Sequence, residues 1–326
     1  MMKLKNNEAT DEGDSFSRLP DEVLISIFTK LSDLTSLFQC SLVCKRFAST
    51  MSHIQSIALT DLPSSEVGSF QSHKNECKLF QEILCISSEE IPRYIQSLSI
   101  QKLNFIIFLQ KFKKLESIYL EFSCPRNISN SPFLKWKAKF ASTRVEFQSF
   151  VSLLAASLRK ETASACELVE EQENQEISRE FLEELHDGYE LSLMQCREWV
   201  YILCLLIKCH HSLKSVTVTN FENQGKLVLR DEQLNMWRNS LLKEETLDLE
   251  VSNVMNIASV PLLLLPSSGY VMKDVFLVIV KSPAESHDDV GEEDIITWDF
   301  EEEDKVLGEA VKEILMNHRI SKIDFT

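Results

Sequence analysis

Glycine and proline are scarce in this chain, and the scarcity of glycine excludes one large class of binding site. The 326 residues include 7 glycines and 8 prolines, and the two nearest glycines, Gly291 and Gly308, are 17 positions apart. Loops that cradle phosphate groups need two or three glycines within about six residues, because the backbone must approach the ligand closely. A nucleotide site built on a GxGxxG or P-loop pattern is therefore excluded.

Long apolar runs and paired cysteines are also missing. The longest apolar runs are residues 199–207 and 260–265, whereas a membrane-spanning helix needs about 20 apolar residues. The first residues, MMKLKNNEATDEGD, contain no apolar segment and predict no secretory signal. The 9 cysteines are odd in number and form no CxxC pair, which is typical of free thiols in a reducing compartment. We expect a cytoplasmic or nuclear protein with no membrane partner.

Basic residues are outnumbered, and the acidic surplus is confined to two tracts. The chain has 34 basic and 50 acidic residues, a net charge of −16, which argues against nucleic acid as a partner. Residues 167–190 hold 10 acidic residues and one basic residue, and residues 285–304 hold 11 acidic residues and no basic one. Such tracts are either solvated loops or docking segments for a basic partner, and the sequence leaves both readings open.

The pattern of polar and apolar residues divides the chain into three parts. Residues 1–15 are polar and are predicted to form a disordered tail. Residues 16–53 are predicted to form a compact helical unit, and residues 54–326 mix short strand-like runs with helices. The expected fold is therefore helical at the N-terminus and α/β beyond it, with acidic insertions at 161–190 and 283–304.

Two segments of the larger part are predicted to be helical. Residues 181–211 form a long helix with an apolar face, and residues 133–160 are expected to hold a helix rich in phenylalanine and lysine. In the second segment basic side chains alternate with aromatic ones, and these residues are Lys135, Lys137, Lys139 and Arg144 with Trp136, Phe140 and Phe147. This stretch is either an anion- or nucleic-acid-binding patch or the solvated face of a helix whose aromatic side packs inward.

A weak internal repeat runs through the larger part. Six hexads share the order apolar, any, small or polar, apolar, any, apolar, and they lie at 54–59, 95–100, 115–120, 213–218, 272–277 and 320–325. The alternation at their last three positions is typical of strands. The 20-residue step from 95 to 115 is the size of one leucine-rich repeat. The hexads predict an irregular, leucine-rich-repeat-like, mainly parallel layer, with an unrelated α/β fold as the alternative.

Residues 16–53, FSRLPDEVLISIFTKLSDLTSLFQCSLVCKRFASTMSH, carry the clearest local signals. Pro20 suits the first position of a helix, and Asp21 and Glu22 are favoured in its first turn. Apolar residues then recur at steps of three and four, namely Val23, Leu24, Ile27, Phe28 and Leu31. A second short helix follows Asp33, and a third is predicted to start at Ser41. Three helices this short bury little apolar surface against one another, so part of their apolar face needs an outside partner.

The segment resembles an F-box. The resemblance covers the whole motif in order and spacing and rests on Leu19, Pro20, Glu22, Val23, Leu24, Ile27, Phe28, Leu31, Leu34, Leu37, Val43, Cys44, Lys45, Arg46 and Phe47. The N-terminal position of the motif and the strand–helix pattern after it are also similar to plant F-box proteins of the auxin-up-regulated group.

The resemblance implies a substrate-recognition subunit of an SCF (Skp1–cullin–F-box) ubiquitin ligase. The F-box of such a subunit binds a Skp1-type adaptor, which links it to cullin-1, and the downstream domain holds the substrate protein. The implied adaptor contacts are Leu19, Pro20, Leu24, Ile27, Phe28, Leu31, Leu37, Val43, Cys44 and Phe47. No catalytic residue, cofactor or metal is implied.

Three other hypotheses remain. The first is a Skp1-bound scaffold that acts outside a cullin ligase, and the second is an enzyme with an unrecognised cysteine–histidine pair. The third is a zinc site at the densest group of soft ligands, Cys204, Cys209, His210 and His211, which would need further ligands from elsewhere. Cys40 and Cys44 are expected to be small buried side chains rather than metal ligands.

Overall fold

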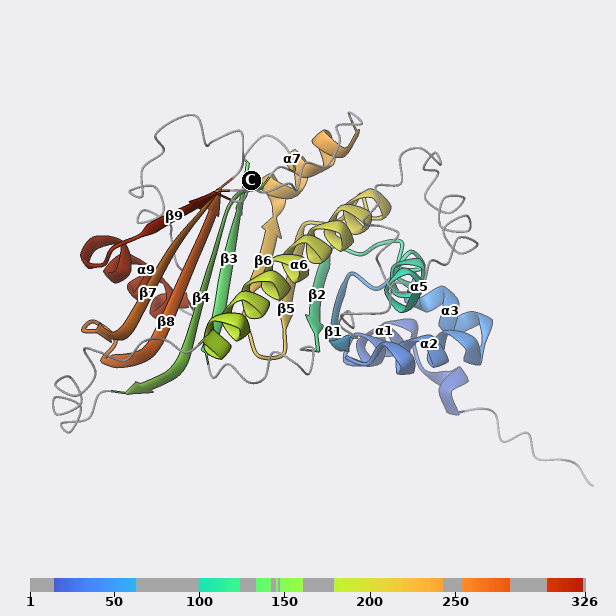
Figure 1. Ribbon diagram of the computed structural model, residues 1–326. Coiled ribbons are helices and arrows are strands. Elements are labelled where there is room, and N and C mark those ends of the chain that lie inside the picture. The colour runs from blue at the N-terminus through green and yellow to red at the C-terminus, as the bar shows by residue number, and fades with distance from the viewer. Residues whose placement is uncertain are drawn as a thin grey trace, which may run out of the picture.

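The computed structural model joins an N-terminal helical unit to two sheets that share one long helix (Figure 1). It describes residues 15–62, 100–123, 133–141, 145, 147–160, 179–242, 254–281 and 304–324. The expected order, helices first and a mixed α/β part afterwards, is confirmed.

The N-terminal unit consists of a 3-10 turn and three short helices: η1 (Ser15–Arg18), α1 (Asp21–Phe28), α2 (Leu34–Val43) and α3 (Lys45–Met51). The third helix begins four residues later than predicted. The Ser41 hydroxyl donates to the Phe38 carbonyl at 2.6 Å within α2, so Ser41 belongs to the second helix. Cys44 is extended, with φ −158° and ψ 164°, and its sulfur accepts the Phe47 N–H at 3.4 Å. Cys44 therefore caps α3.

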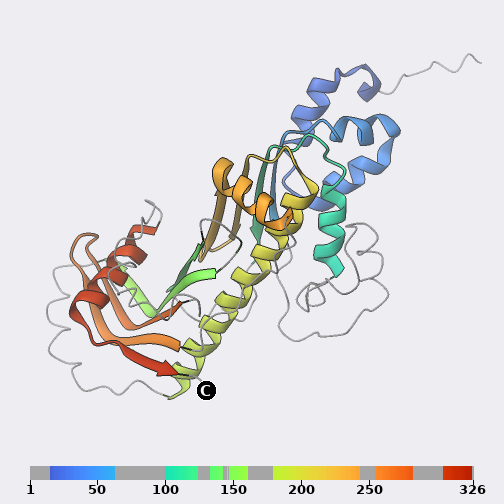
Figure 2. The same ribbon diagram turned by 90° about the horizontal axis from the view of Figure 1, so that it is seen from above.

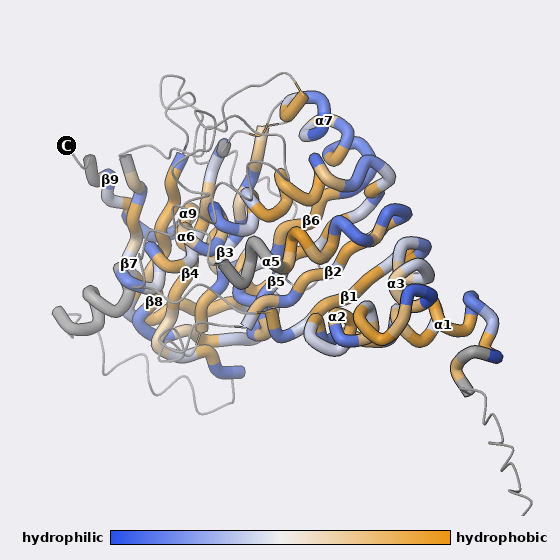
Figure 3. The backbone as a smooth tube through the Cα atoms, turned by 90° about the vertical axis from the view of Figure 1, so that its right-hand side faces the viewer, coloured by the Kyte–Doolittle hydropathy of each residue, from blue (hydrophilic) through white to orange (hydrophobic). Residues whose placement is uncertain are grey.

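The apolar core of this unit continues into the first sheet. The large side chains Leu24, Phe28, Leu37 and Met51 are buried, and the Phe28 ring meets the Phe47 ring edge-on at 5.3 Å. The same cluster of buried residues includes Ile54 and the side chains of the adjoining strands. In Figure 3 hydrophobic residues colour the N-terminal helices as strongly as the neighbouring strands. The helical unit therefore has no separate core of its own.

The first sheet, sheet A, has the strand order β1-β2-β5-β6. Its strands are β1 (Ser56–Leu62), β2 (Ser117–Phe122), β5 (Ser215–Asn220) and β6 (Lys226–Arg230). The first three run parallel, and β6 returns antiparallel to β5. Alternate side chains on each strand are buried, as a sheet with one face against helices requires.

Three of the six predicted hexads lie side by side in sheet A. Their third-position serines, Ser56, Ser117 and Ser215, are direct neighbours in the parallel register. The hexads at 272–277 and 320–325 fall instead in the second sheet, and 95–99 lies outside the described residues. Within the described residues the parallel layer has three strands, and a leucine-rich-repeat-like architecture is not confirmed.

The second sheet, sheet B, is antiparallel at every pairing, in the order β3-β4-β8-β7-β9. Its strands are β3 (Phe133–Phe140), β4 (Phe147–Lys160), β7 (Val254–Leu265), β8 (Tyr270–Lys281) and β9 (Ser321–Asp324). Helix α9 (Lys305–Asn317) packs its buried side chains on one face of the sheet.

The prediction of a helix over 133–160 is wrong, because the segment forms β3 and β4. Lysines at 135, 137 and 139 alternate with apolar residues at every second position, which is the period of a strand. In β4 both alternating sets are buried. Phe150 and Leu154 belong to clusters on one side of the sheet, and Val151 and Leu153 pack in the cluster that contains α9. A strand covered on both faces loses the alternation of polar and apolar residues that would identify it.

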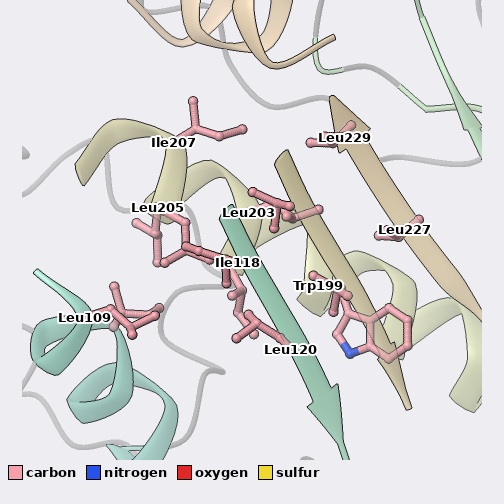
Figure 4. Close-up of a cluster of buried hydrophobic side chains, with 14 of the residues drawn as sticks. Leu109, Ile118, Leu120, Trp199, Leu203, Leu205, Ile207, Leu227 and Leu229 are labelled. Carbon is pink, nitrogen blue, oxygen red and sulfur yellow. The ribbon is translucent and has the colours of Figure 1, made fainter. Parts of the chain in front are cut away.

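One long helix, α6 (Arg179–Cys209), spans both sheets, as Figure 2 shows from above. The predicted long apolar helix is confirmed. It begins at residue 179, so the last part of the acidic insertion that was predicted to extend to residue 190 is helical. The C-terminal half of α6 packs Trp199, Leu203 and Ile207 against sheet A (Figure 4). The helix α7 (Asp231–Leu242) packs beside it. No helix within the described ranges is long and apolar enough to cross a membrane.

The two sheets meet at Trp136 on β3. The backbone N–H of Trp136 donates to the Gln224 carbonyl at 2.8 Å, in the turn between β5 and β6. Its ring lies 5.2 Å from the Trp199 ring and 5.6 Å from the Phe150 ring. Gly225 leaves room for this stack, because a Cβ there would lie 1.9 Å from Cε2 of Trp136. The junction depends on a residue with no side chain.

Replacing Gly225 by alanine is expected to lower the free energy of unfolding by about 3 kcal/mol, because the added methyl group displaces the Trp136 ring. Urea unfolding followed by circular dichroism measures this change. In a Trp136→Leu background the same substitution should cost less than about 1 kcal/mol, since the clash is gone. An equal cost in both backgrounds would show that the Trp136 ring is not the constraint.

Candidate functional site

Exposed apolar side chains concentrate on the N-terminal helices. Six of the eleven large apolar side chains that are exposed within the described part of the chain lie between residues 16 and 43. We call them the exposed apolar set: Phe16, Val23, Ile27, Phe38, Leu42 and Val43. Scattered exposed apolar residues are normal, but a concentration of them over so short a segment marks an interaction surface.

Helix α1 presents two neighbouring apolar faces, one buried and one exposed. Leu24 and Phe28, four residues apart, are buried in the core. Val23 and Ile27, also four residues apart, are about 40% exposed. Because side chains at a spacing of four lie on the same side of a helix, one pair holds α1 to the protein and the other faces solvent.

The C-terminal end of α2 supplies the most exposed members of the set. Leu42 and Val43 are 65% and 67% exposed at the last turn of the helix. Phe38, one turn earlier, is partly covered, because its ring meets that of Phe108 in α5 (Ile100–Leu109) at 5.6 Å. The Lys111 ammonium also lies 5.5 Å from the centre of the Phe38 ring. The end of α2 is therefore open while its middle is anchored.

Arg46 at the start of α3 fixes the segment that leads into α1. Its Nε and Nη2 donate to Oδ1 of Asp21 at 2.9 and 2.7 Å. The same guanidinium donates to the carbonyls of Phe16, at 3.2 Å, and Leu19. The arginine thus ties α3 to residues 25 to 30 positions earlier, and it holds the Leu19–Pro20 step beside α1.

The structure separates the ten predicted adaptor contacts into three groups. Pro20, Ile27, Val43 and Cys44 are exposed, and Leu19 and Leu31 are half-buried. The remaining four, which pack in the chain's own core, are Leu24, Phe28, Leu37 and Phe47. In this structure those four support the surface from beneath, and a direct contact between them and a partner stays a prediction.

Four exposed residues were not among the predicted contacts: Phe16, Val23, Phe38 and Leu42. Val23 could have been found from its spacing of four from Ile27, which places both on one face. Cys44 also differs from expectation, because it is exposed rather than buried. Its place as the N-cap of α3, between two helices, keeps it out of the core.

Among the described residues, the soft ligands near the end of α6 are not brought together as a metal site. Within the described ranges, no three histidine, cysteine or acidic side chains are placed to hold a metal ion. Burial raises the pKa of the Cys204 thiol to about 12 and lowers the pKa of the His210 imidazole to about 4. Both groups are therefore neutral near pH 7, and a neutral buried thiol is a weak nucleophile and a weak metal ligand.

Comparison with known proteins identifies the class of the N-terminal unit: residues 16–55 match the F-box-like family, so the chain carries an F-box-like domain at this position. Along almost its whole length the chain is also similar to plant F-box proteins. It is 27% identical to the F-box protein AUF2 of Arabidopsis thaliana, over 93% of this chain and 96% of AUF2. It is 24% identical to the F-box protein AUF1 of the same plant, over 94% of this chain and 97% of AUF1. No solved structure gives a match.

These comparisons confirm the resemblance to plant F-box proteins that the motif predicted. They support the role of an SCF substrate receptor in general terms, and an F-box-like domain implies a Skp1-type partner in the same general sense. The matched family and the relatives are F-box proteins, and no catalytic family is among them.

Asp33 positions the start of α2, and its removal should be measurable. Its carboxylate accepts the Ser36 N–H at 2.7 Å and the Thr35 N–H at 3.2 Å. Asp33→Ala is expected to lower the free energy of unfolding by about 1 kcal/mol, and Asp33→Asn, which keeps an accepting oxygen, by less.

The same cap gives a pH dependence with a definite sign. Hydrogen bonds from Ser36 hold the pKa of the Asp33 carboxyl below its usual value of 3.8. A carboxyl whose pKa is lower in the folded state stabilises the fold above its unfolded pKa, and this contribution is lost as the pH falls through the folded value. The stability gap between wild type and Asp33→Asn should therefore close below pH 3.8, in urea unfolding from pH 7 to pH 2. A gap that stays constant over this range would contradict the cap.

Proposed function

We propose that this protein is the substrate receptor of an SCF ubiquitin ligase. The F-box-like domain binds a Skp1-type adaptor and, through it, cullin-1, and the α/β part holds the protein to be ubiquitinated. The observation that carries the proposal is the exposed apolar set on α1 and α2, within a domain matched to the F-box-like family. The five described cysteines are free thiols, which supports the cytoplasm or nucleus as its location.

Adaptor binding would remove this set from water. Val23 and Ile27 on α1 and Leu42 and Val43 at the end of α2 expose apolar surface that nothing in the described part of the chain covers. Each square ångström of such surface buried by a partner contributes about 25 cal/mol. A partner with an apolar groove is therefore the fitting one, and the acidic tracts lie outside the domain that receives it.

The proposed mechanism is proximity rather than chemistry in this chain. A substrate held on the α/β part shares one complex with the enzyme that carries ubiquitin, so transfer becomes an intramolecular event at a raised effective concentration. The receptor needs two binding surfaces for this, and it needs them in a fixed geometry. The core that runs from α1 into sheet A supports such a geometry, since it leaves no linker between the two parts.

The apolar surface can be tested by placing charge on it. The double variant Leu42→Asp with Val43→Asp is expected to weaken binding to a Skp1-type adaptor by about 30-fold or more, because carboxylates would be buried in an apolar interface. Pull-down with purified adaptor, followed by calorimetry, measures the loss. Leu242→Asp is the matched control, since Leu242 is 71% exposed at the far end of α7 and should leave binding unchanged.

Two further measurements delimit the proposal. The Leu19→Ala and Pro20→Ala double variant changes the step that Arg46 holds, and it should also weaken adaptor binding. A folded Leu42→Asp, Val43→Asp protein that binds adaptor normally would contradict the proposed surface. Adaptor binding without co-purification of cullin-1 would favour the alternative of a Skp1-bound scaffold.

A further inference from the structure

Three lysines lie in the turn that joins α5 to β2, close to the exposed apolar set. Lys111, Lys113 and Lys114 are exposed, whereas Phe112 between them is buried in the core. The turn is held to the end of α5, because the backbone N–H of Lys111 donates to the Phe108 carbonyl at 3.1 Å. The three lysines therefore project from an ordered segment, and that segment lies outside the F-box-like domain.

Lys111 connects this turn to the exposed apolar set. Its ammonium lies 5.5 Å from the centre of the Phe38 ring and 5.4 Å from the centre of the Phe108 ring. Phe38 and Leu42 are four residues apart on α2, so they lie on the same side of that helix. The exposed end of α2 and the lysines therefore form one continuous surface, which begins inside the matched residues 16–55 and ends outside them.

A fourth lysine extends this surface to the end of α6, which lies next to α5 in Figure 1. Lys208 is exposed in the last turn of α6. Burial raises the pKa of the Cys209 thiol, and the positive charges of Lys113 and Lys208 both oppose that rise, so both lysines lie near this thiol. The Gln110 side-chain amide donates to the Cys209 sulfur at 3.2 Å and joins the two segments. We call the four residues Lys111, Lys113, Lys114 and Lys208 the basic patch.

No ion pair compensates the basic patch within the described part of the chain. Glu116, the next acidic residue along the chain, is already paired with Lys214 at 2.7 Å. The contacts of Lys111 with two aromatic rings leave its charge in place, because a ring carries no net charge. The chain as a whole has a net charge of −16, so the patch is opposite in sign to the molecule around it. A local charge of this kind favours an anionic partner.

We propose that the basic patch is part of the adaptor-binding surface, where it pairs with carboxylates of the Skp1-type adaptor. The inference rests on the proposed function, because it extends the surface of that function beyond the F-box-like domain. The adaptor is the fitting partner because a protein that covers Phe38 also reaches the ammonium that lies over its ring. Charges at the edge of an apolar interface act chiefly on the rate at which the partners associate.

The position of the lysines at helix ends gives a second, purely structural explanation. Cations are favoured near the C-terminal end of a helix, and the patch follows the ends of α5 and α6. That role would change the stability of the chain when the lysines are replaced, and it would not change the rate of adaptor binding by the folded protein. The two explanations therefore differ in what they predict for association.

The experiment removes the three charges of the turn from the full chain. Replacing Lys111, Lys113 and Lys114 together by glutamine is expected to slow association with purified adaptor about fivefold at about 50 mM salt. At about 500 mM salt the difference should shrink to less than about twofold, because salt screens exposed charges. Surface plasmon resonance measures the association and dissociation rates separately, and the dissociation rate should change less.

Two control variants separate the patch from the net charge and from the fold. Replacing Lys160, Lys312 and Lys322 together by glutamine removes the same number of charges at exposed positions in sheet B and α9, and it should leave association unchanged. Replacing the three lysines of the turn by arginine keeps their charge and should restore the association rate of the wild type. Urea unfolding of each variant measures any change in stability.

Chemical coupling identifies which carboxylates the lysines meet. A carbodiimide joins an ammonium group to a carboxylate when the two are in contact, and an amide bond forms with loss of one water molecule. In the complex of wild-type chain and adaptor, mass spectrometry should find peptides with Lys111, Lys113 or Lys114 joined to acidic peptides of the adaptor.

Three outcomes would overturn the inference. The first is wild-type association by the glutamine variant of the turn at low salt, and the second is an equal loss in the sheet B control. The third is coupling of the turn only to acidic residues of this same chain. Each of them leaves the proposed function standing if Leu42→Asp with Val43→Asp still weakens binding, whereas a wild-type chain that binds no adaptor would contradict the proposed function itself.

Discussion

The stack of Trp136 between Trp199 and Phe150 is the contact on which the arrangement of the whole α/β part depends. Sheets A and B share no hydrogen-bonded ladder within the described residues, so their common helix α6, this ring and the backbone hydrogen bond from Trp136 to Gln224 are prominent among the contacts that join them. The ring can occupy its place because Gly225 has no side chain. A scarce residue is therefore used where no other would fit.

The N-terminal helices must be stably folded while part of their exposed surface remains apolar. Helices α1 and α2 divide their apolar residues between a buried and an exposed face, as Leu24 and Ile27 show on α1. The inner residues join the core of sheet A, which provides stability that three short helices could not provide alone. Arg46 also holds the segment before α1 in place, because its guanidinium donates hydrogen bonds to backbone carbonyls of that segment. The outer residues are thereby left free for a partner.

Sequence patterns predicted well the elements whose periodicity depends on neighbouring residues. They predicted poorly the features that depend on tertiary packing. The helical spacing around Leu24 and the hexads beginning at 54, 115 and 213 correspond to observed elements, because their periods depend on neighbouring residues. A helix was predicted over 133–160, where the structure has β3 and β4 of sheet B. Burial of β4 on both faces removes the alternation of polar and apolar residues that would have identified it as a strand. The exposure of Leu42 was not predicted, because it depends on where α2 ends.

The continuous core between α1 and sheet A has a mechanical consequence. Two partners bound at the N-terminal helices and at the sheets would be joined by a stiff arm, not by a tether whose length averages over many positions. A stiff arm presents one orientation and one reach, so the site of modification on a captured protein would be chosen by geometry as well as by sequence. Changing the angle of that arm, with every binding residue intact, would then change which lysine of a captured protein is reached.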